Sequence, residues 1–247
     1  MSAPEMKASP LLIARSLVFA AWLYGMLAVM GVGGLPVLLG PRWWSMRWMR
    51  WWAQTVVWGM KVFLGIGFEV RGLEHRPPAG ALVACKHQCM FDTVAPFIFF
   101  DDTCFVLKKE LTILPVYGWF AARARMIAVD RSAHSKALRA LVHASRDRLA
   151  EGRQVIIFPE GTRKAPGSEP DYKPGVAALY RELEAPCTPM ATNSGVCWPP
   201  HGLIRRPGTI VFEFLPPIPP GMKRASFMAV LEDTIEAASN RLIAEQA

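Results

Sequence analysis

The hydrophobic pattern divides the chain into two parts of different character. Residues 17–41 carry no charged side chain, and a second apolar stretch, residues 51–68, is interrupted only by Lys61. A helix needs about 20 apolar residues to cross a bilayer core, so the first stretch is long enough. After the second stretch, short apolar runs alternate with amphipathic segments. We therefore predict membrane-embedded helices over residues 1–68 and a globular domain over residues 69–247.

Tryptophan and arginine alternate between the two apolar stretches. Residues 42–52 read RWWSMRWMRWW, with three arginines among five tryptophans. Tryptophan favours the headgroup level of a bilayer, where arginine meets lipid phosphate. Basic residues flank the first stretch on both sides, so the positive-inside rule does not select an orientation. A helical hairpin that enters one leaflet and a single membrane span both fit this pattern.

Beyond the apolar stretches, the pattern is typical of an α/β domain. Turn residues bound the apolar runs that predict strands, and amphipathic spacing predicts helices. The predicted strands are residues 81–85, 103–107, 126–130, 154–158 and 209–215, and the predicted helices are residues 132–151 and 227–244. Strands that alternate with helices favour a largely parallel sheet flanked by helices. Chemistry in such sheets sits beyond the carboxyl ends of the strands.

Composition indicates membrane contact and anionic partners. Hydrophobic residues make up 52% of the chain and charged residues 19%, whereas soluble domains carry about 25% charged residues. The formal net charge of +8 favours phosphorylated substrates, acidic carrier proteins or anionic lipids. No nucleic-acid recognition motif accompanies the charge, so we expect no nucleic-acid partner. The five cysteines lack disulfide spacing, which predicts a reducing compartment and a domain that faces the cytoplasm.

The first candidate site directly follows the strand at residues 81–85. The segment KHQCMFD places His87 and Asp92 five residues apart, which is about 140° around a straight α-helix. The two side chains can meet only if the histidine lies in the strand-to-helix turn and the aspartate in the first helical turn, where the helix dipole favours a carboxylate. The aspartate would then bind one imidazole nitrogen and leave the other as a base. A purely structural pair is the alternative.

Three further strand ends offer cations. Arg163 in FPEGTR, after the strand at 154–158, has a planar fork suited to phosphate, and Glu160 can bond a hydroxyl or hold the arginine. Lys109 and Arg131 follow two other predicted strands. A solvated Glu–Arg surface pair is the alternative interpretation of the FPEGTR segment. Together, the four strand ends indicate a site that activates a hydroxyl beside a phosphate.

The segments KHQCMFD, KKELTILPVYGW, MIAVDR, FPEGTR and TPMATNSG, in this order and spacing, resemble the glycerolipid acyltransferase family. The chain is most similar to bacterial 1-acyl-sn-glycerol-3-phosphate acyltransferases, over residues 72–217. The resemblance implies transfer of a fatty acyl group from acyl-CoA or acyl carrier protein to the 2-hydroxyl of lysophosphatidic acid, forming phosphatidic acid for phospholipid biosynthesis. It implies no metal or redox cofactor, because the thioester is already activated. The alternatives are another acceptor (glycerol 3-phosphate, another lysophospholipid or a lyso-ornithine lipid) and a non-catalytic membrane-bound scaffold.

The resemblance also assigns residue roles. His87 would be the general base, and Asp92 would orient it and stabilise the imidazolium. The implied acceptor-binding residues are Lys109, Arg131, Glu160, Gly161, Thr162 and Arg163, while Pro189 and Asn193 match the last block of the family. Lys86 stands where many members have asparagine or serine, and we expect it to contact the phosphate or the carrier, or to be solvated. The implied location is the cell inner membrane, with the catalytic domain on the cytoplasmic face.

Overall fold

A computed structural model describes residues 9–130 and 134–246 of the chain. Seven strands form one sheet in the order β1-β7-β6-β2-β5-β3-β4. The strands are β1 (Ile66–Arg71), β2 (Ala81–Cys85), β3 (Thr103–Lys108), β4 (Ile127–Val129), β5 (Gln154–Ile157), β6 (Cys187–Thr192) and β7 (Gly208–Phe214). Only the β6–β7 pair is antiparallel; every other neighbouring pair in this sheet is parallel. The predicted largely parallel sheet is therefore confirmed, with β1 and β7 reversed at one edge.

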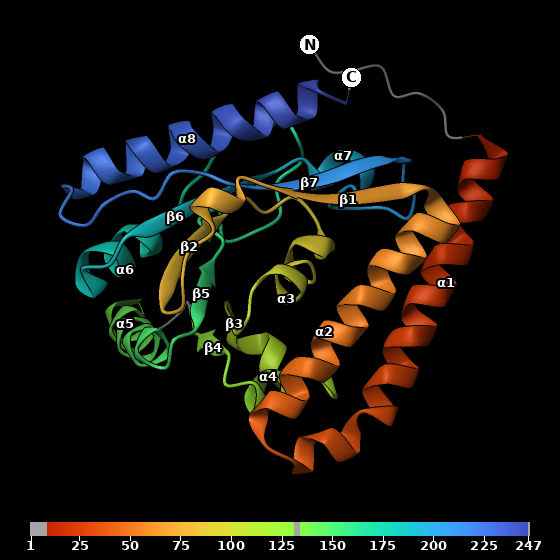
Figure 1. The fold of residues 1–247 in the computed structure, drawn as a ribbon, viewed down its shortest axis with the longest axis horizontal. Helices are drawn as coiled ribbons and strands as arrows, with labels where there is room; N and C mark the ends of the chain where they lie inside the picture. The colour runs from red at the N-terminus through yellow and green to blue at the C-terminus, as the bar shows by residue number, and fades with distance from the viewer. Residues whose placement is uncertain (1–8, 131–133, 247) are drawn as a thin grey trace.

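Helices of very different length precede, connect and follow the strands (Figure 1). They are α1 (Pro10–Gly33), α2 (Arg42–Gly59), α3 (Pro96–Phe99), α4 (Tyr117–Arg123), α5 (His134–Ala150), α6 (Gly175–Leu183), α7 (Ser194–Cys197) and α8 (Arg224–Ala244). Shorter helical turns are η1 (Leu35–Leu39), η2 (Met60–Leu64), η3 (Leu73–His75), η4 (Met90–Thr93) and η5 (Lys109–Ile113). The helices α5 and α8 confirm the two predicted helices, although the start predicted for α5 falls on residues outside the described part.

The helices cover the sheet on both faces. Strand β2 shows how the sequence directs this, because successive side chains of a strand point to opposite faces. Val83 and Cys85 belong to the core under α1, α2 and α3, whereas Leu82 and Ala84 belong to the core under α5, α6 and α8. All four side chains are fully buried. Strand β2 therefore lies at the centre of the molecule, and its carboxyl end carries the histidine loop.

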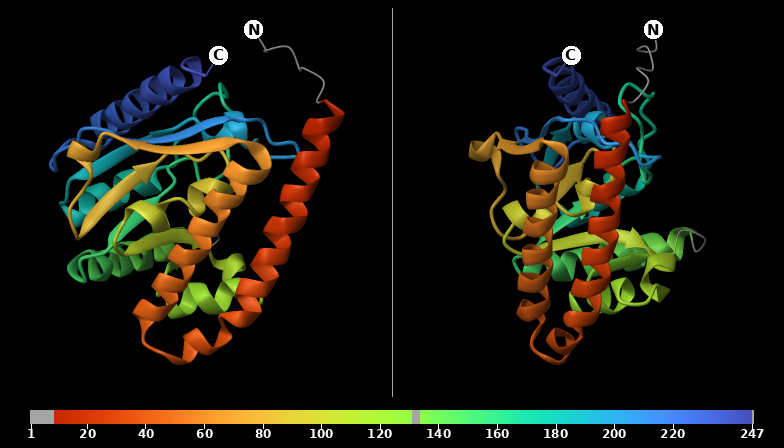
Figure 2. Two further views of the ribbon diagram at one scale, coloured as in Figure 1. Left: turned by 45° about the vertical axis from the view of Figure 1, so that its right-hand side comes forward. Right: turned by 90° about the vertical axis from the view of Figure 1, so that its right-hand side faces the viewer.

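The two N-terminal helices run antiparallel as a hairpin joined by η1 (Figures 1 and 2). Phe19 of α1 and Val56 of α2 are buried in the same core as the sheet. Strand β1 begins at Ile66, directly after the hairpin, and pairs with β7. The division of the chain at residue 68 stays a prediction, since the hairpin and the sheet share one hydrophobic core.

Helix α1 is long and apolar enough to cross a membrane. Only 17% of its apolar window is buried inside the protein, which is unlike the core helix of a soluble domain. Its exposed residues include Leu17, Val18, Val29 and Val32. Exposed apolar surface of this extent is typical of a lipid or protein contact. The helix thus indicates membrane association.

Candidate active site

The candidate residues gather at one edge of the sheet. The strands β2, β5, β3 and β4 are parallel neighbours, so their carboxyl ends meet at the same edge. His87 follows β2, Glu160 and Arg163 follow β5, and Lys109 follows β3. Arg131, which follows β4, lies outside the described residues. The sheet therefore brings three of the four predicted strand ends to the same edge.

His87 and Asp92 meet as their spacing predicts. His87 lies in the turn after β2, and Asp92 lies in η4, the short helix that follows. The Nδ1 atom of His87 is 3.1 Å from Oδ2 of Asp92. An ionised carboxylate only accepts hydrogen bonds, so this contact assigns the proton to Nδ1 and leaves Nε2 as the basic nitrogen. Within the described part of the chain, Nε2 makes no hydrogen bond.

Four polar groups besides the imidazole hold the buried Asp92 carboxylate. The backbone N–H groups of Gln88 and Cys89 donate to Oδ2 at 2.6 and 2.8 Å. The hydroxyl of Ser194, at the start of α7, donates to Oδ1 at 2.5 Å, and the Cys89 thiol lies 3.6 Å from the same oxygen. A buried carboxylate needs such partners to offset its lost hydration. The aspartate is thus fixed in one orientation toward the histidine.

Phe158 fixes the plane of the imidazole. Its ring stacks on the His87 ring with centroids 4.1 Å apart and an interplanar angle of 22°. The other neighbour of Phe158 is Phe105 of β3, also stacked. The His87 side chain is 14% exposed, so the ring is enclosed but remains open to a substrate. The sequence does not indicate this role, because only the tertiary fold shows which aromatic ring faces the histidine.

The segment after β5 also holds both sides of the His87 peptide. The Oε2 atom of Glu160 accepts from the His87 N–H at 3.0 Å, and the Lys164 N–H donates to the His87 carbonyl at 2.9 Å. Gly161 permits the tight turn between them, since its φ of +66° is unfavourable for other residues. Of the two roles considered for Glu160, holding Arg163 is not seen among the described residues, because its two oxygens bind Lys86 and the His87 N–H. Glu160 is buried and holds the His87 peptide in place.

Lys86 also differs from the expectation. Its side chain is buried and forms ion pairs with Glu160 at 2.8 Å and with Glu236 of α8 at 2.5 Å. It is therefore neither solvated nor directed at a phosphate. The sequence could not reveal this, since Glu236 lies 150 residues away. Burial raises the pKa of the Glu160 carboxyl, and the Lys86 ammonium opposes that shift.

The residues predicted to bind the phosphate differ in whether their side chains already have a partner in the protein. Thr162 and Arg163 are exposed, and neither side chain has a hydrogen bond or ion pair with any other described residue. Lys109 is exposed but lies 3.1 Å from Asp130 at the end of β4. Neighbouring strands are about 4.8 Å apart. Strand β5 is next to β2, whereas β3 is one strand further away. Lys109, after β3, therefore lies further from His87 than the β5 loop that carries Arg163. Arg163 is therefore an exposed cation on the loop that contacts the His87 peptide.

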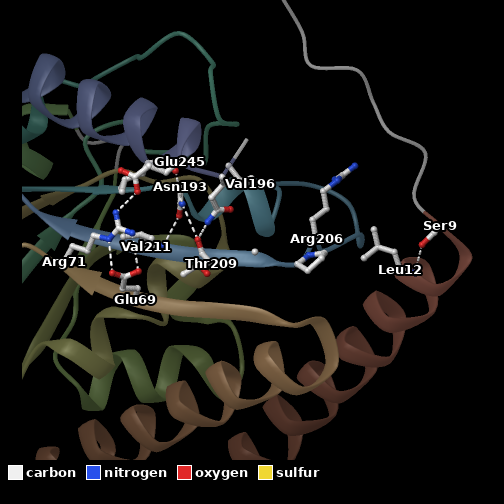
Figure 3. Close-up of a pocket in the computed structure, with 14 residues that line it drawn as sticks. Ser9, Leu12, Glu69, Arg71, Asn193, Val196, Arg206, Thr209, Val211 and Glu245 are labelled. Carbon is white, nitrogen blue, oxygen red and sulfur yellow. Dashed lines mark hydrogen bonds and ion pairs between the residues drawn. The ribbon is translucent and has the colours of Figure 1, made fainter.

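Asn193 plays a structural part. Its Oδ1 accepts from the Val211 N–H, and its Nδ2 donates to the Thr209 carbonyl, so it ties the end of β6 to β7. The side chain lines a pocket of about 750 Å³ between β7, the end of α8 and the start of α1 (Figure 3). The charged side chains of Arg71, Glu69 and Glu245 on its wall pair with one another. That pocket is distinct from the histidine site.

The cysteines near the site are poor candidates for nucleophiles. Burial, and then the charge of Asp92, raises the pKa of the Cys89 thiol well above its ordinary value, and burial does the same for Cys85. A thiolate is the reactive form of cysteine, so both side chains stay protonated. Among residues 9–130 and 134–246, no group of three or more His, Cys, Asp or Glu side chains is arranged to hold a metal ion.

Comparison with known proteins identifies the family. The acyltransferase family model matches residues 67–193. The chain is 38% identical to the 1-acyl-sn-glycerol-3-phosphate acyltransferase of Pseudomonas aeruginosa over 159 residues, which are 64% of this chain and 62% of the relative. It is 30% identical to the enzyme of the same name from Limnanthes alba over 170 residues, 66% of this chain and 59% of that relative. The chain thus spans about three fifths of the length of these relatives.

A solved structure shares the whole fold. The 1-acyl-sn-glycerophosphate (LPA) acyltransferase PlsC from Thermotoga maritima matches with a TM-score of 0.79 and 19% identity, covering 96% of this chain and 99% of that one. At this identity the match shows the fold. The family model covers more than half of the chain and includes the histidine loop, the β5 loop and the end of β6. The chain belongs to the acyltransferase family.

Proposed function

We propose that the protein is a 1-acyl-sn-glycerol-3-phosphate acyltransferase. It transfers a fatty acyl group from acyl-CoA or acyl carrier protein to the 2-hydroxyl of lysophosphatidic acid, and the product is phosphatidic acid. The observation that carries the proposal is the His87–Asp92 contact, in which Nδ1 is held at 3.1 Å and Nε2 makes no hydrogen bond to any residue of 9–130 or 134–246. The relatives' names support the choice of acceptor.

The proposed reaction uses His87 as a general base. Nε2 removes the proton of the 2-hydroxyl while the hydroxyl oxygen attacks the thioester carbonyl. The C–S bond then breaks, and the leaving thiolate takes the proton from the imidazolium, so a free thiol and phosphatidic acid are formed. Asp92 stabilises the imidazolium between these steps. The thioester is an activated acyl donor, so the proposed reaction needs no metal or redox cofactor.

Arg163 is the proposed partner of the acceptor phosphate. It is exposed at the same sheet edge as His87, and its guanidinium can bind two phosphate oxygens at once. Lys109 supplies a second positive charge in this proposal, shared with Asp130. Gly161 and Thr162 shape the turn that presents Arg163. Arg131 keeps its proposed role on the basis of the family resemblance.

The membrane supplies the acceptor and part of the binding energy. We place the protein at the cell inner membrane with the catalytic domain on the cytoplasmic face. The apolar helix α1 supports the membrane contact, and the five free, buried cysteines fit a reducing compartment. Exposed apolar side chains at the hairpin tip, such as Leu39 and Trp43, continue onto η5 and α4 with Ile113 and Trp119. We propose that these residues enter the lipid surface.

Acyl transfer by the detergent-solubilised protein tests the function. The acceptor panel contains lysophosphatidic acid, glycerol 3-phosphate, other lysophospholipids and lyso-ornithine lipid, each with both donors. We expect turnover with lysophosphatidic acid and a loss of about 1000-fold in His87→Ala and Asp92→Asn. His143→Ala is the matched control, because His143 contacts Asp147 at 3.3 Å on the exposed face of α5. Full activity in folded His87→Ala, or no turnover with any acceptor, would contradict the proposal.

A further inference from the structure

A buried lysine joins the histidine loop to the last helix of the chain. The Lys86 side chain is 4% exposed, and its Nζ lies between Oε1 of Glu160 and Oε1 of Glu236. Glu236 belongs to α8 and lies outside the residues matched by the family model. Burial of an ammonium group is unfavourable, because the charge loses its hydration. The proposed proton transfer does not involve the Lys86 ammonium, so its burial requires another explanation.

The two oxygens of Glu160 have different partners. One oxygen binds Lys86 at 2.8 Å, and the other accepts the His87 N–H at 3.0 Å. A change in the position of the Lys86 ammonium would therefore rotate the carboxylate that holds the His87 peptide. The ammonium also favours the ionised form of Glu160, which is the stronger acceptor. The geometry thus couples Lys86 to the backbone of His87.

Glu236 fixes the other end of the network. It accepts the Lys86 ammonium at 2.5 Å and the Tyr172 hydroxyl at 3.0 Å on the same oxygen. Burial and the charge of Glu236 raise the pKa of Tyr172, so the hydroxyl stays protonated and donates. Helix α8 packs on the sheet through buried residues such as Leu231 and Ile235. Glu236 therefore provides a rigid anchor for Lys86.

We propose that Lys86 and Glu236 are positioning residues for the base. In this arrangement Glu236 of α8 fixes the Lys86 ammonium, and Lys86 fixes the Glu160 carboxylate. Glu160 in turn fixes the His87 peptide, so that Nε2 stays directed at the acceptor hydroxyl. The inference rests on the proposed function, because it assumes that His87 takes the proton. It assigns a role in acyl transfer to a helix beyond the region that the family model matches.

Steady-state kinetics of four variants test the inference. We expect Lys86→Met to lower kcat by about 10- to 100-fold with little change in the KM for the acceptor, since small displacements of a catalytic group have effects of this size. Glu236→Gln should lower kcat less, because an amide oxygen still accepts from Lys86. The double variant should match Lys86→Met alone, because both changes break one link. Glu232→Gln, one helical turn away on α8 and without a hydrogen bond or ion pair among the described residues, should be unchanged.

Two kinetic results would overturn the inference. A raised KM for the acceptor with an unchanged kcat in Lys86→Met would mean that the lysine binds the substrate phosphate. A lowered melting temperature with an unchanged kcat per folded molecule would mean that the network only stabilises the fold. Melting temperatures of all four variants are therefore measured beside the kinetics.

A second measurement does not depend on the substrate. In protein labelled with nitrogen-15 at histidine, the ring signals of His87 are assigned by their loss in His87→Gln. We expect a single tautomer with a protonated Nδ1 in the wild type and a mixture of tautomers in Lys86→Met. An unchanged tautomer in Lys86→Met would overturn the inference even if acyl transfer is confirmed. If Lys86→Met changes the tautomer of His87 but the wild-type protein shows no acyl transfer, the coupling of Lys86 to His87 is supported and the proposed function is rejected.

Discussion

Ser194 donates a hydrogen bond of 2.5 Å to Oδ1 of Asp92, although the two residues are 102 positions apart in the chain. The bond forms because β6, which ends just before Ser194, pairs directly with β2, which ends just before the histidine loop. The other oxygen of Asp92 faces His87. Two neighbouring strands therefore hold the aspartate between them. Its orientation toward the imidazole depends on both.

Ser194→Ala should weaken catalysis with a limited effect on folding. Among the described residues, the variant leaves Oδ1 of Asp92 with the weak Cys89 thiol as its one remaining partner, so the carboxylate can turn away from the histidine. We expect kcat to fall about tenfold and the free energy of unfolding to fall by about 1 kcal/mol. Ser239→Ala is the control, because Ser239 is equally buried but its hydroxyl has no hydrogen-bond partner in the part of the chain that the structure describes. Equal kcat values for the two variants would show that the Ser194 bond does not position Asp92.

Arg163→Ala should raise the KM for a phosphorylated acceptor. A hydrogen bond to a charged group is worth about 1.5–3 kcal/mol, which corresponds to a change of about 10- to 100-fold. Because Arg163 has no ion pair among the described residues, the whole effect should appear in substrate binding. Lys109→Ala should have a smaller effect, since its charge is already shared with Asp130. The measurement is the KM for lysophosphatidic acid at constant donor concentration.

A neutral acceptor distinguishes an effect of the Arg163 charge on the substrate phosphate from an effect on the conformation of the turn. Monoacylglycerol lacks the phosphate, so any basal transfer to it should be the same in the wild type and in Arg163→Ala. Arg181→Ala serves as the protein control, because Arg181 is an exposed arginine on α6. If Arg163→Ala lowers transfer to both acceptors equally, the arginine acts on the turn and not on the phosphate.

Asp102 should make stability depend on pH in the acid range. Burial alone would raise the pKa of Asp102, but hydrogen bonds and charge from Arg42 and Arg153 outweigh it and hold the pKa below its usual value. A carboxyl with a lowered pKa stabilises the fold above its unfolded pKa of about 3.9, and this contribution is lost as the pH falls through the lower folded pKa.

The variant Asp102→Asn tests this dependence. At pH 7 we expect it to lower the free energy of unfolding by about 1–2 kcal/mol, a modest value because the Arg42–Asp102 pair is partly exposed. The difference from the wild type should shrink below pH 4, where the wild-type carboxylate also becomes protonated. A constant difference from pH 7 to pH 3 in denaturant titrations would argue against the charge of Asp102 as its cause.

The strands were predictable where burial and hydrophobicity coincide. Strand β2 matches its prediction to the residue, because Ala81–Cys85 is wholly apolar. Strand β6 was not predicted, since Pro189 and two threonines interrupt its apolar run, yet every residue of Cys187–Thr192 is buried. Strand β1 was also missed, because Ile66 lies inside the apolar stretch assigned to the hairpin. A search for apolar runs therefore misses a buried strand whose sequence contains polar residues or proline.

The candidate site was predictable only in its local part. The His87–Asp92 contact spans five residues, so the geometry of one turn determines it. Ser194 and Glu236 reach the histidine loop from 102 and 150 positions away, and their approach depends on the order of the strands and on the packing of α8. Lys86 shows why the rest of the site could not be predicted. From the sequence, a lysine in a loop is expected to be solvated, whereas the fold buries this one between two carboxylates.

The membrane contact should include η5 and α4 as well as the hairpin. Val116, which directly precedes α4, packs against the end of α1, where a Cβ on Gly31 would lie 2.7 Å from its side chain, so α1 and the start of α4 belong to one surface. Beside it, Ile113 is 80% and Trp119 51% exposed. Burial of a large apolar side chain in lipid gains about 1.5–3 kcal/mol. A nitroxide label at Ile113→Cys should therefore lie within the bilayer in vesicles of phosphatidylethanolamine and phosphatidylglycerol.

Leu73→Cys provides the matched label position. Leu73 is 60% exposed on η3, at the far end of β1 from the hairpin, and the native cysteines are buried. We expect the spin label at position 113 to relax with oxygen and to be shielded from a water-soluble nickel complex, and the label at position 73 to show the reverse. Equal access of the nickel complex to both labels would limit the lipid contact to the hairpin, because the membrane would then leave η5 in water.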